Sequence, residues 1–174
     1  MRALIVYETL FGNAKSVAEA IGAGLRTGAD VSVIDVRSAT ESIEGVDLLV
    51  VGGPTHQLGM TRPRSRRQAE TQYEEAPPAA QTGLREWIAA LRITRGTAAA
   101  VFDTRLNHPS VLRMLDHAAR TTRRSLEHRG ARTVAPPQRF LVESATGPLL
   151  PHEIDRARDW GQALLSLAGT TAQR

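Results

Sequence analysis

Short apolar runs alternate with segments of helical period along the whole chain, and this alternation constrains the fold more than any other feature of the sequence. The runs are RALIVY at 2–7, VSVIDV at 31–36, DLLVVGG at 47–53, AAAVFD at 98–103 and FLV at 140–142. Apolar runs of this length are typical of strands buried on both faces of a sheet. The fifth strand is expected at the FLV end of 133–142, because Pro136 and Pro137 cannot occupy a central ladder.

Between the runs, apolar residues recur with a period close to 3.6, which predicts amphipathic helices. Asn13 is the predicted N-cap of the first helix and Thr82 that of the second. Pro109 opens a third helix that ends before Gly130, and a fourth closes the chain over 154–168. The apolar stripes are Ala14, Val17, Ala18, Ile21 and Leu25; Leu84, Trp87, Ile88 and Leu91; Val111, Met114, Leu115, Ala118 and Thr122; and Ile154, Ala157, Trp160, Gly161, Leu164 and Ala168.

Strands that alternate with helices form a parallel sheet with helices on both faces and right-handed crossovers. For 174 residues we expect one domain over 1–174, an α/β doubly wound five-stranded parallel sheet of order 2-1-3-4-5 in three layers. Ligands of such sheets bind beyond the carboxyl ends of the strands, at the switch between strands 1 and 3. The predicted site is therefore formed by the loops at 8–13, 54–81 and 104–108.

The composition excludes several classes of protein. With 41% apolar and 23% charged residues the chain matches an average soluble domain. The absence of cysteine rules out disulfides, thiolate nucleophiles and cysteine-ligated metals. No basic leader or membrane-length apolar run is present, so we expect a cytoplasmic protein. The five histidines show no metal-ligand spacing, so no metal site is predicted.

The formal charge is +4, and Lys15 is the only lysine beside 21 arginines. The bases gather in two clusters: Arg62, Arg64, Arg66 and Arg67, and Arg113, Arg120, Arg123 and Arg124. Aromatic residues make up only 4%, so there is no stacking surface for nucleic acid. We interpret both clusters as solvated surface, with an anionic ligand or partner as the alternative.

The loop at 8–13 joins a strand to a helix, and the free amides and dipole of the helix N-terminus suit a phosphate group. Gly12 allows close backbone approach, while Thr9 and Asn13 offer neutral hydrogen bonds. The loop matches neither GxxxxGK[ST] nor GxGxxG, which disfavours nucleoside triphosphates and dinucleotides. The alternative is an ordinary strand-to-helix turn.

The other two loops supply a flat surface and polar groups. Residues 52–59 hold three glycines and Pro54, which predicts a turn whose backbone can lie close to a planar ligand. In this turn His56 is either an ordinary loop histidine or a catalytic one. Residues 54–81 form a long polar loop without apolar period, expected to be the most mobile segment and part of the site. Residues 103–108 carry donors and acceptors, unless Asn107 or His108 only caps a helix.

Three motifs together resemble the flavodoxin family. They are VYETLFGN at 6–13, GGPTH at 52–56 and AVFDTR at 100–105, and the first is similar to the Tyr-Glu-Ser-Met-Phe-Gly-Asn-Thr opening of short flavodoxin-like proteins. The resemblance covers essentially the whole chain, including RFLVE at 139–143 and GPLL at 147–150. It implies a flavodoxin-like fold with FMN as cofactor.

The resemblance also implies which residues bind the flavin. The phosphate loop would be Thr9, Leu10, Phe11, Gly12, Asn13 and Ala14; the first flavin wall Pro54, Thr55, His56 and Gln57; and the second wall Asp103, Thr104 and Arg105. Phe11 and Ala14 stand where the family usually has hydroxyl residues, so two phosphate ligands are absent. Two lost hydrogen bonds to a charged group cost roughly 3–6 kcal/mol, which predicts weaker FMN binding.

Three functions follow as hypotheses. The first is an FMN-binding redox protein, an FMN-dependent oxidoreductase in its enzymatic form, that passes electrons to a small acceptor or a protein partner. The second is an NAD(P)H-dependent quinone reductase, because GPT followed by GM resembles the loop of flavodoxin-like quinone reductases, with His56 as a candidate proton donor. The third is a flavin-free interaction or regulatory module, which Phe11 and Ala14 favour.

Overall fold

The computed structural model describes residues 1–55, 60–72, 82–107, 118–144 and 146–169. Its central sheet is parallel throughout, with strand order β2-β1-β4-β6 followed by β7 and β8, which both pair with β6. The strands are β1 (Arg2–Tyr7), β2 (Asp30–Asp35), β4 (Leu48–Pro54), β6 (Ala98–Leu106), β7 (Arg132–Thr133) and β8 (Gln138–Val142). The predicted order 2-1-3-4-5 is confirmed, with β7 and β8 sharing the fifth position on either side of the two prolines.

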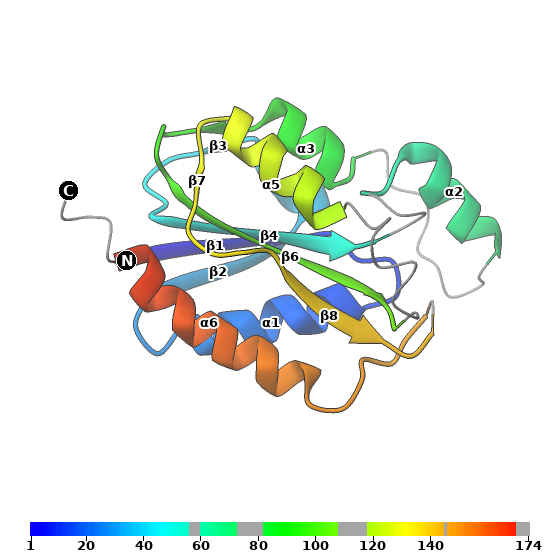
Figure 1. Cartoon of the computed structure of the whole chain (residues 1–174). Coiled ribbons are helices and arrows are strands. Elements are labelled where there is room, and N and C mark those ends of the chain that lie inside the picture. The colour runs from blue at the N-terminus through cyan, green and yellow to red at the C-terminus, as the bar shows by residue number, and fades with distance from the viewer. Residues whose placement is uncertain (56–59, 73–81, 108–117, 145, 170–174) are drawn as a thin grey trace.

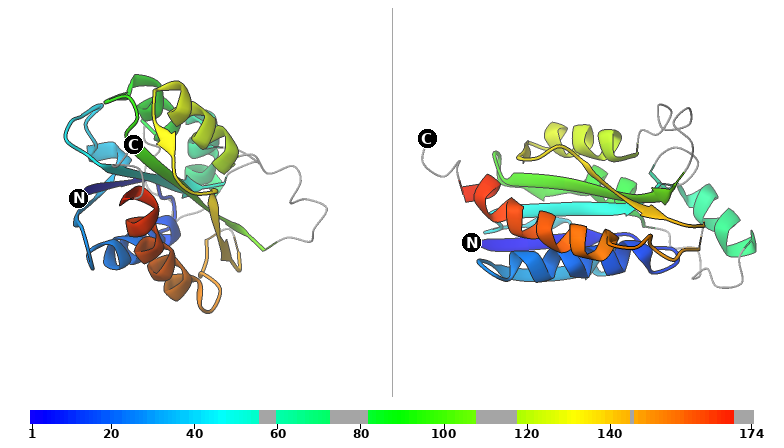
Figure 2. Two further views of the ribbon diagram at one scale, coloured as in Figure 1. Left: turned by 60° about the vertical axis from the view of Figure 1, so that its left-hand side comes forward. Right: turned by 60° about the horizontal axis from the view of Figure 1, so that its bottom comes forward.

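Helices cover both faces of this sheet, as Figure 1 shows. One layer holds α1 (Asn13–Leu25) and α6 (Glu153–Gly169), and the other holds α3 (Leu84–Ala90) and α5 (Ala118–His128). A further helix, α2 (Pro63–Gln72), lies beyond the carboxyl ends of the strands, as Figure 1 and the right-hand view of Figure 2 show. The short elements are η1 (Val36–Ser38) and a separate two-stranded parallel sheet of β3 (Ser42–Ile43) and β5 (Arg92–Ile93).

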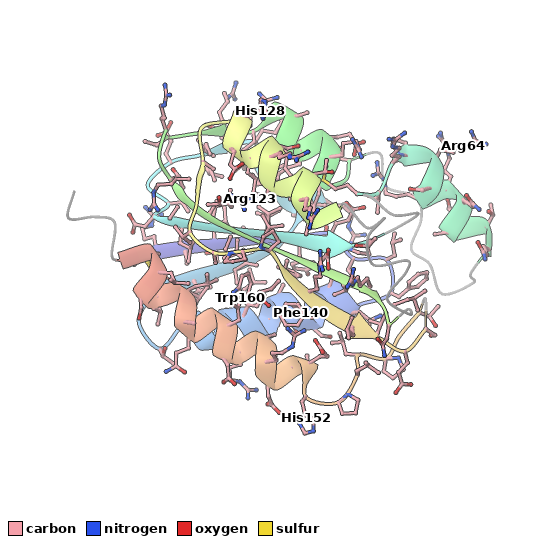
Figure 3. The ribbon with its side chains drawn as sticks, in the orientation of Figure 1. Arg64, Arg123, His128, Phe140, His152 and Trp160 are labelled. Carbon is pink, nitrogen blue, oxygen red and sulfur yellow. The ribbon has the colours of Figure 1, made fainter. Side chains whose placement is uncertain are left out.

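The apolar residues of the sheet divide into two cores by the alternation of side chains along the strands. Ile5, Val50 and Phe102 pack toward α1 and α6, while Val6 and Val51 pack toward α3 and α5. Phe140 contacts both Phe102 and Trp160 edge to face, with ring centroids 6.2 and 6.4 Å apart, and the second pair lies between β8 and α6 (Figure 3).

Close approach of α1 and α6 depends on two glycines. A Cβ added to Gly24 would lie 2.0 Å from the carbonyl oxygen of Arg158, and one added to Gly161 would lie 2.2 Å from that of Ile21. The two helices can therefore pack backbone to backbone only because these positions lack side chains. This contact holds the C-terminal half of α1 against α6.

Several predicted boundaries are wrong. The N-cap of α1 is Gly12, not Asn13, and that of α3 is Gly83, not Thr82. The second strand begins and ends one residue before 31–36. Strand β6 continues to Leu106, so Thr104 and Arg105 are strand residues rather than loop residues, because Thr104, Arg105 and Leu106 keep their ladder with β8.

Two further predictions concern the long segments. The stretch 54–81, expected to be a polar loop, contains α2, and its residues 56–59 and 73–81 lie outside the described part of the chain. The helix predicted to open at Pro109 falls outside the described residues up to 117, and α5 then runs from Ala118 and ends before Gly130 as expected. Arg113 also lies outside the described residues.

Candidate functional site

The turn between β1 and α1 leaves the N-terminus of a long helix open. Gly12 adopts φ +87°, its N–H donates to the hydroxyl oxygen of Thr9 at 2.9 Å, and no side chain caps α1. The first turn also lacks acidic residues. The backbone N–H groups of the first turn and the positive end of the helix dipole are therefore available to an anion.

A pocket of about 290 Å³ opens beside this turn, at the carboxyl ends of the parallel strands. Its volume is close to the lower end of the range for small-molecule sites, roughly 300–1,000 Å³. Nine of the predicted site residues line it: Thr9, Leu10, Phe11, Asn13, Ala14, Pro54, Thr55, Thr104 and Arg105. Three segments far apart in the sequence thus meet in one place, and the N–H of Thr55 donates to the carbonyl of Thr104 at 2.8 Å to hold two of them together.

Four predicted residues do not line the pocket. Gly12 forms the turn beside it. Asp103 is 3% exposed and borders a separate small cavity next to Glu8, because its side chain leaves β6 on the opposite face from Thr104. His56 and Gln57 lie outside the described residues.

Helix α2 contributes pocket residues that the sequence reasoning missed. Gln68 and Gln72 line the pocket from α2, and Leu106 and Val142 line it from the ends of β6 and β8. The helix has a sequence signal, since Pro63 at its first position is followed by nine residues without glycine or proline. That signal does not reveal where the helix packs.

A buried polar cluster holds α2 in place. Glu8 accepts hydrogen bonds from the N–H of Leu84 at 2.8 Å and from the hydroxyl of Thr61. Nη1 of Arg66 donates to the same hydroxyl oxygen at 3.0 Å, and Nη2 lies 3.0 Å from Oε2 of Glu86. Arg66 is therefore not part of a solvated arginine surface, as the sequence suggested, but is 3% exposed between two carboxylates.

Burial raises the pKa of the Glu8 carboxyl above its ordinary value of 4.5, while the hydrogen bonds from Thr61 and Leu84 and the charge of Arg66 oppose the rise. The carboxyl thus binds its proton more firmly than a glutamate in water does. Its charge state therefore acts on the contacts that join the end of β1 to the segments around α2 and α3.

Asn13 is engaged at the other side of the turn. Its Nδ2 donates to the carbonyl of Thr146 at 3.1 Å, and a Cβ on Gly147 would lie 2.7 Å from its Oδ1. The side chain of Asn13 therefore fastens the segment after β8 against the turn. Any contribution of Asn13 to an anion comes more readily from its backbone N–H.

Charge in the pocket is positive. Among the described residues that line it, Arg105 is the one with a charged side chain.

The described residues contain no group of three or more histidine, aspartate or glutamate side chains able to hold a metal ion. Nor does any helix in this part of the chain have both the length and the apolar character that crossing a bilayer requires.

Comparison with solved structures identifies the fold as that of the flavodoxins. The chain superposes on a flavodoxin from the domain Archaea with a TM-score of 0.66 at 20% identity, covering 97% of this chain and 99% of that one. For oxidised Flavodoxin 1 from Bacillus cereus the TM-score is 0.67 at 18% identity, with 95% and 98% covered. A flavodoxin from Pseudomonas aeruginosa gives 0.67 at 17% identity, with 97% and 99% covered.

No protein-family model and no curated protein matches the sequence. The chain is thus an α/β protein with the flavodoxin fold, as the motifs at 6–13, 52–56 and 100–105 implied.

Proposed function

We propose that the chain binds FMN in the pocket beside α1 and works as a redox protein. The observation that carries this proposal is the junction of an uncapped helix N-terminus with a pocket lined from the ends of β1, β4 and β6. When bound, FMN supplies one- and two-electron chemistry that no side chain of this chain provides. The residues would supply binding and orientation.

The donor set fits a flavin phosphate. The N–H groups of Asn13 and Ala14 would hold the phosphate, and the hydroxyl of Thr9, whose oxygen already accepts from Gly12, keeps its hydrogen to donate. Arg105 adds a positive charge to the same pocket. Backbone donors and one arginine thus stand in for the hydroxyl side chains absent at Phe11 and Ala14.

The lining at the strand ends offers surface for the ring system. Pro54 and Thr55 lie beside Thr104 at the ends of the paired strands β4 and β6, and Phe11 and Leu10 add apolar surface. Gln68 and Gln72 of α2 would close the pocket and exclude water. His56 and Gln57 remain candidate wall residues on the resemblance alone, and the cytoplasmic location and single domain remain predictions.

A titration with two ligands tests the proposal. Quenching of flavin fluorescence should show FMN binding, and riboflavin, which lacks the phosphate, should bind at least about tenfold more weakly if charged hydrogen bonds to the α1 amides hold FMN. The visible absorbance spectrum of the purified protein shows independently whether flavin is bound. If neither flavin binds at high micromolar concentration, the flavin-free module becomes the better hypothesis. If FMN binds, NAD(P)H-driven reduction of a quinone by the loaded protein distinguishes the quinone reductase from a carrier.

A further inference from the structure

An exposed cationic surface borders the pocket. We define the arginine face by its five members, Arg62, Arg64, Arg67, Arg120 and Arg124. All five are exposed, and within the described ranges none has an ion-pair partner. Figure 3 shows the labelled Arg64 pointing from α2 away from the body of the protein.

The opposite helical layer is built differently. Lys15 pairs with Glu19 on α1, and on α6 Arg156 pairs with Glu153 and Arg158 with Asp155. Helix α6 also carries Asp159. Among the described residues, Arg26 at the end of α1 is exposed without an ion pair, and α2 carries the exposed acid Glu70. Exposed arginines without an ion pair are nevertheless more numerous on α2 and α5 than on α1 and α6.

The two parts of the arginine face are neighbours. Met60 and Thr61, which precede α2, and Ala119 and Thr122 of α5 line the same small cavity. Arg67 is adjacent in sequence to Gln68, which lines the proposed flavin pocket. A partner seated on the arginine face would therefore lie at the rim of that pocket.

The chemistry of the face selects the kind of partner. Within the described helices α2 and α5 there is no aromatic residue on which the bases of a nucleic acid could stack. The exposed large apolar side chains of the described residues are Met1, which precedes β1, and Leu167, near the end of α6. Figure 1 shows the start of β1 and the end of α6 at the opposite end of the molecule from α2, so the arginine face has no apolar anchor for a lipid surface among these residues.

We propose that the arginine face docks an acidic protein that exchanges electrons at the pocket. Complementary charge speeds the encounter with such a partner and orients it, and contributes less to the affinity than to the association rate. The electron exchange rests on the proposed function, whereas the docking itself does not.

The test compares two double variants of equal charge change. Arg64→Glu with Arg67→Glu alters the arginine face, and Arg26→Glu with Arg158→Glu alters the exposed surface of α1 and α6. The probe is fluorescein-labelled poly-L-glutamate, followed by anisotropy with and without FMN, and amide chemical shifts locate its binding. Duplex DNA and vesicles of anionic phospholipid serve as competitors.

We expect poly-L-glutamate to shift the amide resonances of α2 and α5. Its Kd should rise about tenfold for the Arg64→Glu, Arg67→Glu variant. Its Kd for the Arg26→Glu, Arg158→Glu control should stay within about twofold of the native value. Binding should weaken as salt is raised through about 0.1 M. Equal losses in both variants, or displacement of the probe by DNA or vesicles at lower concentration than by unlabelled poly-L-glutamate, would overturn the inference. Failure of FMN to bind would overturn the proposed function and leave the docking result standing.

Discussion

Nη1 of Arg66 lies 3.8 Å from Oε1 of Glu8, and both side chains are almost completely buried. This ion pair connects the residue after β1 to a helix that would otherwise have little to hold it, since the buried residues of α2 are only Ser65, Arg66 and Ala69. The hydroxyl of Thr61 lies between the two groups and bonds to both. Helix α2 is thus attached through charge and hydrogen bonds more than through an apolar face.

Replacing Arg66 should loosen α2. Arg66→Met leaves the buried Glu8 carboxylate without its cation, and breaking a buried pair from one side costs about 3–5 kcal/mol. We expect the free energy of unfolding in urea to fall by about 3 kcal/mol, hydrogen exchange to speed up in α2, and FMN binding to weaken because Gln68 and Gln72 leave the pocket.

The matched control is Arg67→Met, on the same helix but exposed. Its effect on stability should stay within about 0.5 kcal/mol. Similar losses in Arg66→Met and Arg67→Met would mean that the buried network does not hold α2.

Stability should depend on pH through Glu8. Because burial raises the pKa of this carboxyl above 4.5, the folded protein keeps a proton that the unfolded chain has lost when the pH lies between 4.5 and the raised pKa. The free energy of unfolding must therefore decrease as pH rises through this window, by up to about 1.4 kcal/mol per pH unit. The decrease ends once the folded carboxyl is also ionised.

Glu8→Gln removes the titrating group while keeping a side chain of similar size. Urea midpoints measured across the window should then show a flatter pH profile for the variant than for the native protein. Parallel profiles would show that Glu8 titrates normally in the folded state.

The strands and their order were predictable because each depends on a local pattern. Runs such as RALIVY and DLLVVGG are buried on both faces, and parallel α/β topology allows few orders for five of them. The turn at 8–13 and the pocket loops were found for the same reason, since ligand sites of this fold lie where the strands end.

The position of α2 was not predictable from local sequence. Arg66 looks like one more member of a surface cluster, and only the approach of Glu8 and Glu86, far from it in the chain, makes its burial favourable. The extension of β6 through Leu106 likewise depends on pairing with β8. Gly12 rather than Asn13 is the N-cap of α1 because the turn needs a positive φ, which glycine adopts at little cost.

A side chain at Gly12 should disturb the flavin site through the backbone. A Cβ there would meet no atom within 4 Å, so the cost of Gly12→Ala is conformational strain at φ +87°, about 1–2 kcal/mol. Relief of this strain moves the first-turn amides of α1, and we expect FMN affinity to fall.

Gly96→Ala is the matched control. Gly96 has φ +89° and equally open surroundings, but it lies in the turn before β6, at the end of the sheet away from the pocket. Both variants should lose similar stability in urea, and only Gly12→Ala should lose FMN affinity in the fluorescence titration. Equal FMN affinity in the two variants would place the phosphate elsewhere.

A hydroxyl restored at position 14 should tighten FMN binding. Ala14 lines the pocket but is only 1% exposed, so serine, which adds a single oxygen, suits the site better than the larger threonine. One hydrogen bond to a charged phosphate contributes about 1.5–3 kcal/mol at best, and we expect Ala14→Ser to lower the Kd for FMN by about tenfold. The Kd for riboflavin, which has no phosphate, should change little.

The control is Ala18→Ser, one turn further along α1 and wholly buried in the core, which should destabilise the fold without lowering the Kd for FMN. If Ala14→Ser tightened riboflavin as much as FMN, the new hydroxyl would be contacting the ring and not the phosphate, and the α1 N-terminus would lose its assigned role.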